Sequence, residues 1–511
     1  MWDKLTSVQK KRMQIILSSA FVFGVIAHGT MLFNKFSYFD DAEAFNGVGQ
    51  TINLGRWALY ILKQAMMGVF GTKHISLPLF NGGLLILMIA GMYLLIADYL
   101  DIRSAGLNIL TTGFLISFPA VTGIFGFMFT ASYYFLGMFL GVLGAYIYAR
   151  KKNWKTALVC IALMAFSTGI YQANIPVSLC ALLLFLLKDT YESELSWKDY
   201  IKLVLAEIGI CVGHLVLYLA VNSVFLSMFH MKMSPYKGTD TLGVTNIPGY
   251  LSRILSAYRE FLFPVSGADR TMYPYSAKYV HILLCAVMIG FCLYSFAKHF
   301  RSRPVQTIQA VLIFLVYPLA AYFIFVMVEA KEVYTVMVFG EAFLFILFTW
   351  IMEQFPEKHK VLKMAKQGIL CLAGLLLFLN IRLSNISYLR AEILQSQLIS
   401  YNTALISRIQ SAEGYDDKLP VVYIHPLQKS TDIVSATGYL FGPSDIVPFH
   451  FSSLINNYTW EKTMRMWCGF DPETGNAEDY INRKEVAEMP VYPDEGSIRV
   501  IDGAVVVKFA D

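Results

Sequence analysis

The sequence predicts an all-α polytopic membrane protein that carries a small α/β domain at its C-terminal end. Its 511 residues are 56% hydrophobic and only 15% charged, and the mean hydropathy is +0.53. The apolar residues gather in segments of about 20, the helix length that crosses a hydrocarbon core of about 30 Å. Groups of Lys and Arg lie in the loops that are predicted to be cytoplasmic, whereas the tight outer turns at 122–127 and 171–174 contain neither, as the positive-inside rule describes.

Segment length predicts about eleven membrane-spanning helices. The expected spans are 15–33, 79–97, 106–125, 128–149, two within 156–187, then 203–221, 280–297, 308–328, 335–352 and 367–383. The segment 156–187 is too long for one crossing, and lysines both precede and follow it. Basic residues at both ends place both ends in the cytoplasm, so we expect a helical hairpin that turns at residues 171–174.

The same charge pattern orients the chain. Lys4, Lys10, Lys11 and Arg12 precede the first span and hold the N-terminus in the cytoplasm, and an odd number of spans then leaves the C-terminal end outside it. The predicted organisation is a membrane domain over 1–383, with large outer loops at 34–78 and 222–279, and an extracytoplasmic domain over 384–511.

The outer regions carry secondary-structure signals of their own. Apolar residues at helical spacing predict helices lying in the membrane interface at 54–65 and 250–263. The tail predicts a helix over 387–410, a strand over 419–424 and a hairpin over 498–509 that turns at Asp502-Gly503. No GxGxxG, GxxxxGK[ST], HExxH or CxxC motif is present, which excludes the usual nucleotide and zinc motifs.

Two adjacent carboxylates, Asp40 and Asp41, follow the first span and open the first outer loop. Ionised groups beside hydrocarbon are costly unless they are hydrated or paired, so this pair is a candidate catalytic site. The same residues are compatible with a helix start, in which Asp40 is the N-cap and Glu43 completes a capping box. A capping role also fixes a carboxylate in place and does not exclude catalysis.

Further candidates lie on the predicted outer side. Arginines can clamp a phosphate with two hydrogen bonds, or they can extend to lipid headgroups; the candidates are Arg56, Arg253, Arg259 and Arg382. Aromatic and amide side chains suit a sugar ring, and the candidates are Trp57, Tyr171, Gln172 and Asn174. Trp57 is equally compatible with an interface anchor, and the other three with a tight outer turn.

These features resemble one family. Asn34 at the end of the first span, the Asp40-Asp41 pair, Gly55-Arg56-Trp57 and Tyr171-Gln172 at an outer turn look like the bacterial O-antigen serotype-converting glucosyltransferases of the Gtr type II family. The resemblance covers most of the membrane portion and none of the tail. It implies a GT-C fold in the bacterial cytoplasmic (inner) membrane, with an active site that faces outward.

The resemblance also implies a reaction. A hexose, glucose in this family, moves from a polyprenyl-phosphate donor to a cell-surface glycan, and an acidic residue of the first outer loop is the base. The assignment falls on Asp40 or Asp41, and the motif does not choose between them. One base with direct displacement predicts inversion at the sugar carbon, and arginines would offset the charge on the departing phosphate.

The remaining expectations concern ligands and alternatives. The sequence requires no cofactor, although the acidic pair is compatible with a divalent metal. The expected partners are the lipid-linked donor, the glycan acceptor and membrane lipid, with no nucleic acid. A flippase or transporter of lipid-linked sugars would share the spans and intramembrane acids such as Glu207 and Glu341, but should show an internal repeat, and none is visible. A glycan polymerase is the nearest enzymatic alternative.

Overall fold

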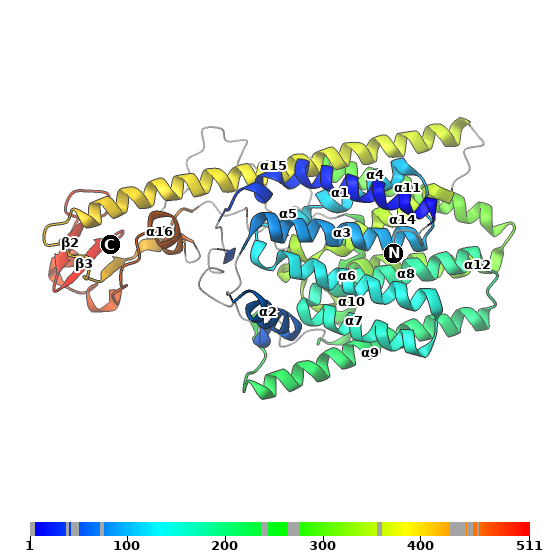
Figure 1. The fold of residues 1–511 in the computed structure, drawn as a ribbon, viewed down its shortest axis with the longest axis horizontal. Coiled ribbons are helices and arrows are strands. Elements are labelled where there is room, and N and C mark those ends of the chain that lie inside the picture. Colours follow the sequence, from blue (N-terminus) through cyan, green and yellow to red (C-terminus); the bar gives the residue numbers. More distant parts are fainter. Residues whose placement is uncertain are drawn as a thin grey trace. The chain divides into compact units, whose positions relative to one another are not determined.

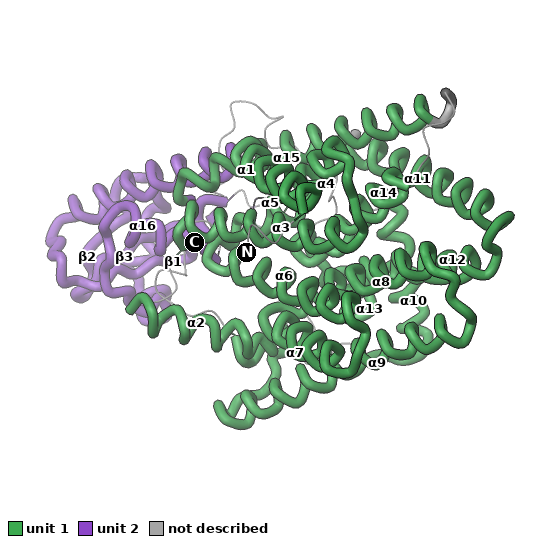
Figure 2. Tube along the Cα trace, turned by 45° about the vertical axis from the view of Figure 1, so that its right-hand side comes forward, with its two compact units in different colours: residues 1–35, 47–387, 443–447 green, residues 36–46, 388–442, 448–511 purple. Residues whose placement is uncertain are grey.

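The computed structural model describes residues 6–36, 40–41, 51–71, 76–236, 244–263, 276–354, 360–429, 446, 449, 453–456 and 459–511. The chain divides into two compact units, shown in Figure 2. Unit 1 contains Met1–Lys35, Gly47–Ser387 and Pro443–Val447, and unit 2 contains Phe36–Asn46, Tyr388–Gly442 and Pro448–Asp511.

Unit 1 is a bundle of long helices that lie side by side (Figure 1). Its helices are α1 (Ser7–Phe33), α2 (Trp57–Phe70), α3 (Pro78–Tyr99), α4 (Ala105–Ser117), α5 (Pro119–Phe125), α6 (Met128–Lys151), α7 (Trp154–Ile170), α8 (Ile175–Glu192), α9 (Trp197–Met228), α10 (Ile247–Leu262), α11 (Ser276–Phe300), α12 (Pro304–Ala321), α13 (Ile324–Met327), α14 (Phe343–Gln354) and the start of α15 (Lys360–Gln410). Short 3₁₀ turns include η3 (Ile52–Leu54), η4 (Gln172–Asn174) and η8 (Phe339–Ala342).

Within the described residues, eight helices are long and apolar enough to cross a membrane, or nine if α4 and α5 count as one bent span. The prediction of a multi-pass helical membrane protein is confirmed, and so is the helical hairpin of α7 and α8, which turns at η4. The predicted total of eleven is not confirmed, because α7 has only 17 residues and α14 only 12.

Two predicted spans are interrupted for local reasons. Pro119 has no N–H to donate, and the helix bends by 45° between α4 and α5. Residues 335–352 were expected to form one helix, but 335–337 and 339–342 form two 3₁₀ turns and the α-helix begins at Phe343. A Cβ on Gly340 would lie 2.6 Å from the carbonyl oxygen of Ala321 and 2.7 Å from Pro176 Cβ, so close backbone packing shapes this segment.

A cluster of polar side chains is buried beside this irregular segment. Tyr322 donates a hydrogen bond to Glu341 on η8, and His281 Nε2 lies 3.2 Å from the other oxygen of the Glu341 carboxyl group. His281 and Glu341 are both fully buried. Irregular backbone at membrane depth is tolerated where protein groups surround it, and these contacts tie η8 to α11 and to the end of α12.

Unit 2 contains a three-stranded mixed sheet. Its strands are β1 (Val421–Ile424), β2 (Ile498–Ile501) and β3 (Ala504–Lys508), in the order β1-β3-β2. β1 pairs parallel to β3 and β2 pairs antiparallel to it, so the predicted strand and hairpin are confirmed. The core packs Tyr423 and Phe509 of the sheet region with Trp460 of α16 (Trp460–Cys468), and it includes Leu398 and Leu405 of α15.

The predicted helix over 387–410 does not stand alone. It is the last part of α15, which runs as one 51-residue helix from the final predicted span into unit 2. Both described outer-loop helices, α2 and α10, also form close to their predicted positions.

Candidate active site

The Gly55-Arg56-Trp57 motif forms a tight turn between η3 and α2. Gly55 adopts the left-handed backbone conformation, with φ +72°, which favours glycine. A Cβ at this position would also lie 2.4 Å from Tyr218 Oη and 2.8 Å from Gln172 Nε2. Backbone conformation and packing therefore both require glycine before Arg56.

Two side chains from the helical bundle hold this turn. Gln172 on η4 donates from Nε2 to the Leu54 carbonyl at 2.7 Å and to Tyr218 Oη at 3.0 Å. The Tyr218 hydroxyl, on α9, donates in turn to the Gly55 carbonyl at 3.2 Å. The turn at residues 171–174, predicted from segment length and flanking lysines, is thus the element that positions Arg56.

Arg56 lies in a pocket of tyrosine rings. Its Nη1 donates to Tyr134 Oη at 3.2 Å, and its guanidinium carbon lies 4.9 Å from the centre of the Tyr171 ring. Tyr134 and Tyr171 stack on each other with centroids 4.4 Å apart. The arginine therefore sits against an ordered aromatic wall, to which it is attracted by hydrogen bonding and cation–π interaction.

The Arg56 guanidinium retains unused hydrogen-bonding capacity. Its Nε is buried with no hydrogen-bond partner, and among the described residues Arg56 forms no ion pair with a carboxylate. Burial acts to lower the pKa of Arg56, but the nearby hydroxyl groups of Tyr134, Tyr171, Tyr236 and Tyr218 outweigh it, so the pKa lies above its usual value. A charged, partly unsatisfied guanidinium is suited to bind an anion.

Trp57 and Asn174, two of the predicted sugar-binding residues, are packed inside the bundle. Trp57 is 5% exposed and stacks on Phe225, with centroids 5.9 Å apart. Asn174 is fully buried and donates from Nδ2 to the Ser167 carbonyl at 3.1 Å. Tyr171 and Gln172 are each 6% exposed. These positions favour a role in shaping the Arg56 turn, and their binding of acceptor sugar stays a prediction.

Gly169 should be essential for the packing of Trp57. A Cβ at Gly169 would lie 2.5 Å from Trp57 Cε2, so Gly169→Ala is expected to displace the indole ring and lower stability by about 1–3 kcal/mol, as overpacking does. The measurement is thermal unfolding in detergent. Gly209→Ala on α9 is the matched control, because a Cβ there meets no atom within 4 Å. Equal melting temperatures for the two variants would contradict the close contact.

The other three candidate arginines have separate surroundings. Arg253 donates from Nη1 to the carbonyls of Val326 and Met327, at 3.2 and 3.3 Å, at the end of α13. Arg259 pairs with its neighbour Glu260 at 2.9 Å. Arg382 is exposed on α15. None of these contacts involves Arg56, so the structure gives the four arginines different environments.

Asp40 and Asp41 belong to unit 2, whereas Arg56 belongs to unit 1. They form part of a 3₁₀ turn in which Asp40 is partly exposed and Asp41 is only 1% exposed. Glu43 lies outside the described residues, and the expected capping box with it. The structure therefore distinguishes the two carboxylates by access to solvent, which the sequence motif could not do.

Lys63 is a buried cation on α2 that sequence reasoning missed. Its side chain is only 7% exposed, and burial lowers its pKa from 10.5 to about 8. The charged form is thus disfavoured in the folded state. In sequence, Lys63 had no signal beyond its place in an amphipathic helix, where lysines usually face water.

Replacing Lys63 with Met, which has a similar shape, should raise the melting temperature at pH 7. The lysine is protonated in both the folded and unfolded states below pH 8, so its burial penalty is then fully present. Between pH 8 and 10.5 the folded protein loses the proton first, and the advantage of Lys63→Met should shrink. Melting curves of both proteins from pH 7 to 10 check this, and a constant difference would contradict the lowered pKa.

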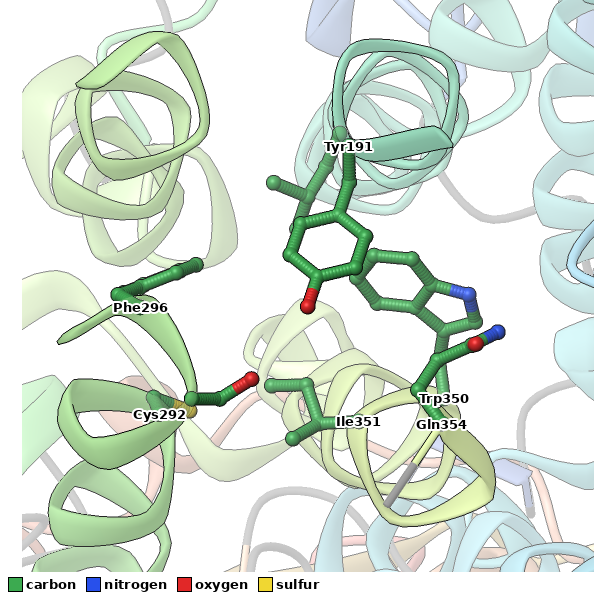
Figure 3. A pocket seen from close by; sticks show the side chains of 8 residues that line it. Tyr191, Cys292, Phe296, Trp350, Ile351 and Gln354 are labelled. Carbon is green, nitrogen blue, oxygen red and sulfur yellow. The ribbon is translucent and has the colours of Figure 1, made fainter. Parts of the chain in front are cut away.

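Figure 3 shows a small pocket elsewhere in unit 1, between the C-terminal parts of α8, α11 and α14. The Tyr191 hydroxyl points into it, and Phe296, Trp350 and Ile351 line its walls. Its lining contains no Lys, Arg, Asp or Glu, so it offers no charge to a phosphate. Among the described residues, no group of three or more His, Cys, Asp or Glu is arranged to hold a metal ion.

A family model described as Glucosyl transferase GtrII matches residues 29–347, more than half of the chain. The protein belongs to the GtrII glucosyltransferase family. The match confirms the resemblance seen in the sequence, and this GtrII protein is a glycosyltransferase of the membrane, which requires a sugar donor and a glycan acceptor. The matched range contains Arg56, Gln172 and Tyr218. No curated protein and no solved structure matches the chain.

Proposed function

We propose that this GtrII protein transfers a hexose, glucose by its family, from a polyprenyl-phosphate donor to a glycan acceptor outside the cytoplasm. The observation that carries the proposal is the Arg56 guanidinium, which lies half-buried among tyrosines, has a buried and unpartnered Nε and has no carboxylate partner among the described residues. A phosphate group would supply both the missing negative charge and the missing acceptor.

Arg56 would act on the leaving group. As the bond between the sugar carbon and the phosphate oxygen breaks, negative charge grows on the phosphate, and a fixed guanidinium stabilises that charge without having to reorganise. Arg253, Arg259 and Arg382 are proposed as further contacts to the donor. Gln172 and Tyr218 would hold Arg56 in place through the backbone of the turn.

Asp40 is proposed as the general base, and Asp41 as a positioning residue. The base must reach a hydroxyl on an incoming acceptor, and Asp40 is the more exposed of the two. In the reaction, the acceptor oxygen bonds to the sugar carbon, its proton moves to Asp40, and polyprenyl phosphate leaves. A single displacement of this kind inverts the configuration of the sugar.

The proposed membrane arrangement follows the distribution of charge. The N-terminus would lie in the cytoplasm, the turn that carries Arg56 would lie on the outer side of the bacterial inner membrane, and residues 384–511 would be extracytoplasmic. A lipid-linked donor suits this location, because nucleotide sugars are not supplied outside the cytoplasm. The GT-C architecture belongs to the same proposal.

The test is sugar transfer by purified protein in lipid nanodiscs. Radiolabelled polyprenyl-phosphate-glucose and UDP-glucose are offered in parallel with envelope glycan as acceptor, with and without EDTA. We expect transfer from the lipid donor alone, and NMR of the product should show an inverted linkage. Transfer from UDP-glucose, or retention of configuration, would contradict the proposal.

The same material separates the alternative functions. A flippase would move the lipid-linked sugar across a liposome membrane without forming a new linkage. A polymerase would give a ladder of product lengths, whereas the proposed enzyme adds one sugar at each acceptor site. The EDTA arm shows whether a divalent metal takes part.

A further inference from the structure

Two tyrosine hydroxyls near Arg56 differ in how fully they are hydrogen-bonded. The Tyr218 hydroxyl accepts from Gln172 and donates to the Gly55 carbonyl, so its proton is already used. The Tyr134 hydroxyl accepts from Arg56 Nη1, and it donates to no residue that the structure describes. A hydroxyl has one proton to donate and two lone pairs to accept with, so Tyr134 keeps its proton available for a ligand.

The hydrogen bond from Arg56 makes this hydroxyl a better donor. A guanidinium is always protonated, and a hydroxyl that accepts a hydrogen bond from a cation donates its own proton more strongly. This contact uses one of the five N–H groups of Arg56, whose side chain makes no other hydrogen bond among the described residues. The cation and the hydroxyl are therefore adjacent, and each retains hydrogen-bonding capacity for an anion.

Tyr134 is held in place by its surroundings. Its ring stacks on Tyr171, with centroids 4.4 Å apart and an angle of 14° between the ring planes, and the residue is 9% exposed. One turn further along α6, a Cβ on Gly137 would lie 2.4 Å from Asn174 Nδ2, so the helix packs directly against η4. The same 3₁₀ turn carries Gln172, which holds the backbone before the arginine. One element thus fixes both the hydroxyl and the guanidinium.

We propose that the Tyr134 hydroxyl is a further catalytic group, which donates a hydrogen bond to the phosphate of the lipid-linked sugar beside Arg56. The inference rests on the proposed function, because that function supplies the phosphate. As the bond between the sugar carbon and the phosphate oxygen breaks, the electron pair stays on that oxygen. The hydroxyl strengthens its hydrogen bond to this oxygen and keeps its proton, while the acceptor proton moves to Asp40. A prepositioned neutral donor thus stabilises the developing charge.

The first test removes the hydroxyl and keeps the ring. Tyr134→Phe is expected to lower kcat about 10–100-fold, the effect of losing one hydrogen bond to a charged group. KM for the lipid-linked sugar should change far less, because the charge is largest in the transition state. Tyr148→Phe is the matched control, since Tyr148 lies on the same helix, is 5% exposed and makes no hydrogen bond through its hydroxyl to a described residue. Equal rates for wild type and Tyr134→Phe, or equal losses in both variants, would overturn the assignment.

The second test separates contact with the phosphate from support of Arg56. If Tyr134 only oriented the guanidinium, Tyr134→Phe would have no effect once Arg56 is replaced by alanine. Direct contact predicts that the double variant has a lower kcat than Arg56→Ala alone, with a similar melting temperature. A double variant as active as Arg56→Ala would make Tyr134 a positioning residue and refute the proposal.

Binding of radiolabelled polyprenyl phosphate distinguishes this inference from the proposed function. The ligand carries the charge that the reaction creates but no sugar, so its affinity does not depend on transfer. Weaker binding by Tyr134→Phe than by wild type and Tyr148→Phe would support the hydroxyl contact even if the wild type transferred no sugar. Equal binding by all three proteins, or none by any, would refute the contact. Transfer by wild type and an equally active Tyr134→Phe would refute it and leave the proposed function standing.

Discussion

Asp40→Asn is expected to lower kcat for sugar transfer by about 10²–10⁴-fold, the usual contribution of a positioned general base. The amide has nearly the same shape as the carboxylate but cannot accept the acceptor proton. Donor binding should be almost unchanged, because Asp40 is proposed to contact the acceptor hydroxyl. The measurements are kcat with the lipid-linked donor and equilibrium binding of polyprenyl phosphate.

Asp41→Asn separates catalysis from positioning. Asp41 is 1% exposed, so its replacement should lower the melting temperature and reduce the rate less than Asp40→Asn does. Asp40→Glu is a useful companion, because it keeps the carboxylate and should recover part of the rate. Full activity in Asp40→Asn would remove Asp40 from the mechanism, and loss of activity in Asp41→Asn alone would transfer the role to Asp41.

Arg56→Ala is expected to reduce kcat/KM by about 10²–10³-fold, the typical cost of removing one group that stabilises developing negative charge. The variant loses both the hydrogen bond to Tyr134 and the unpartnered Nε. Arg56→Lys should recover little, because an ammonium group keeps the charge but lacks the planar fork that binds phosphate with two hydrogen bonds. Steady-state kinetics with varied lipid donor checks both variants.

A structural role for Arg56 would give a different pattern. Added guanidinium ion should partly restore transfer by Arg56→Ala if the cation acts on the donor phosphate, and should not do so if the variant is misfolded. Arg301→Ala, at an exposed position in the turn after α11, is the control for loss of a surface charge. Unchanged donor affinity and rate in Arg56→Ala would end the phosphate assignment.

Charge and spacing predicted the parts of the fold that a membrane imposes. The length of the apolar stretch 156–187 and the lysines at both its ends together predicted the turn between α7 and α8, because the bilayer restricts both the length of a span and where basic residues can lie. Strand alternation likewise located β2 and β3, together with the turn at Asp502-Gly503. These signals are local in sequence, and the packing of distant helices does not alter them.

Long-range contacts could not be predicted in this way. Tyr134 and Tyr218 look like ordinary core aromatics in sequence, yet their hydroxyls meet Arg56 and the Gly55 carbonyl. Trp57 was expected to anchor at the interface or stack on a sugar, but Gly169 leaves space for it inside the bundle. The 3₁₀ turns before Phe343 depend on close packing at Gly340, which no local pattern records.

Gln172 and Tyr218 hold the turn before Arg56 through hydrogen bonds to its backbone, and this restricts how the sequence can diverge. Gln172 and Tyr218 bond to the carbonyl oxygens of Leu54 and Gly55, which every amino acid possesses. Gly55 has no such freedom, because any larger residue would collide with both partners. Among related sequences, positions 55, 172 and 218 should therefore change together or not at all. Adaptation to a new sugar or acceptor would then have to occur at positions outside this group of three.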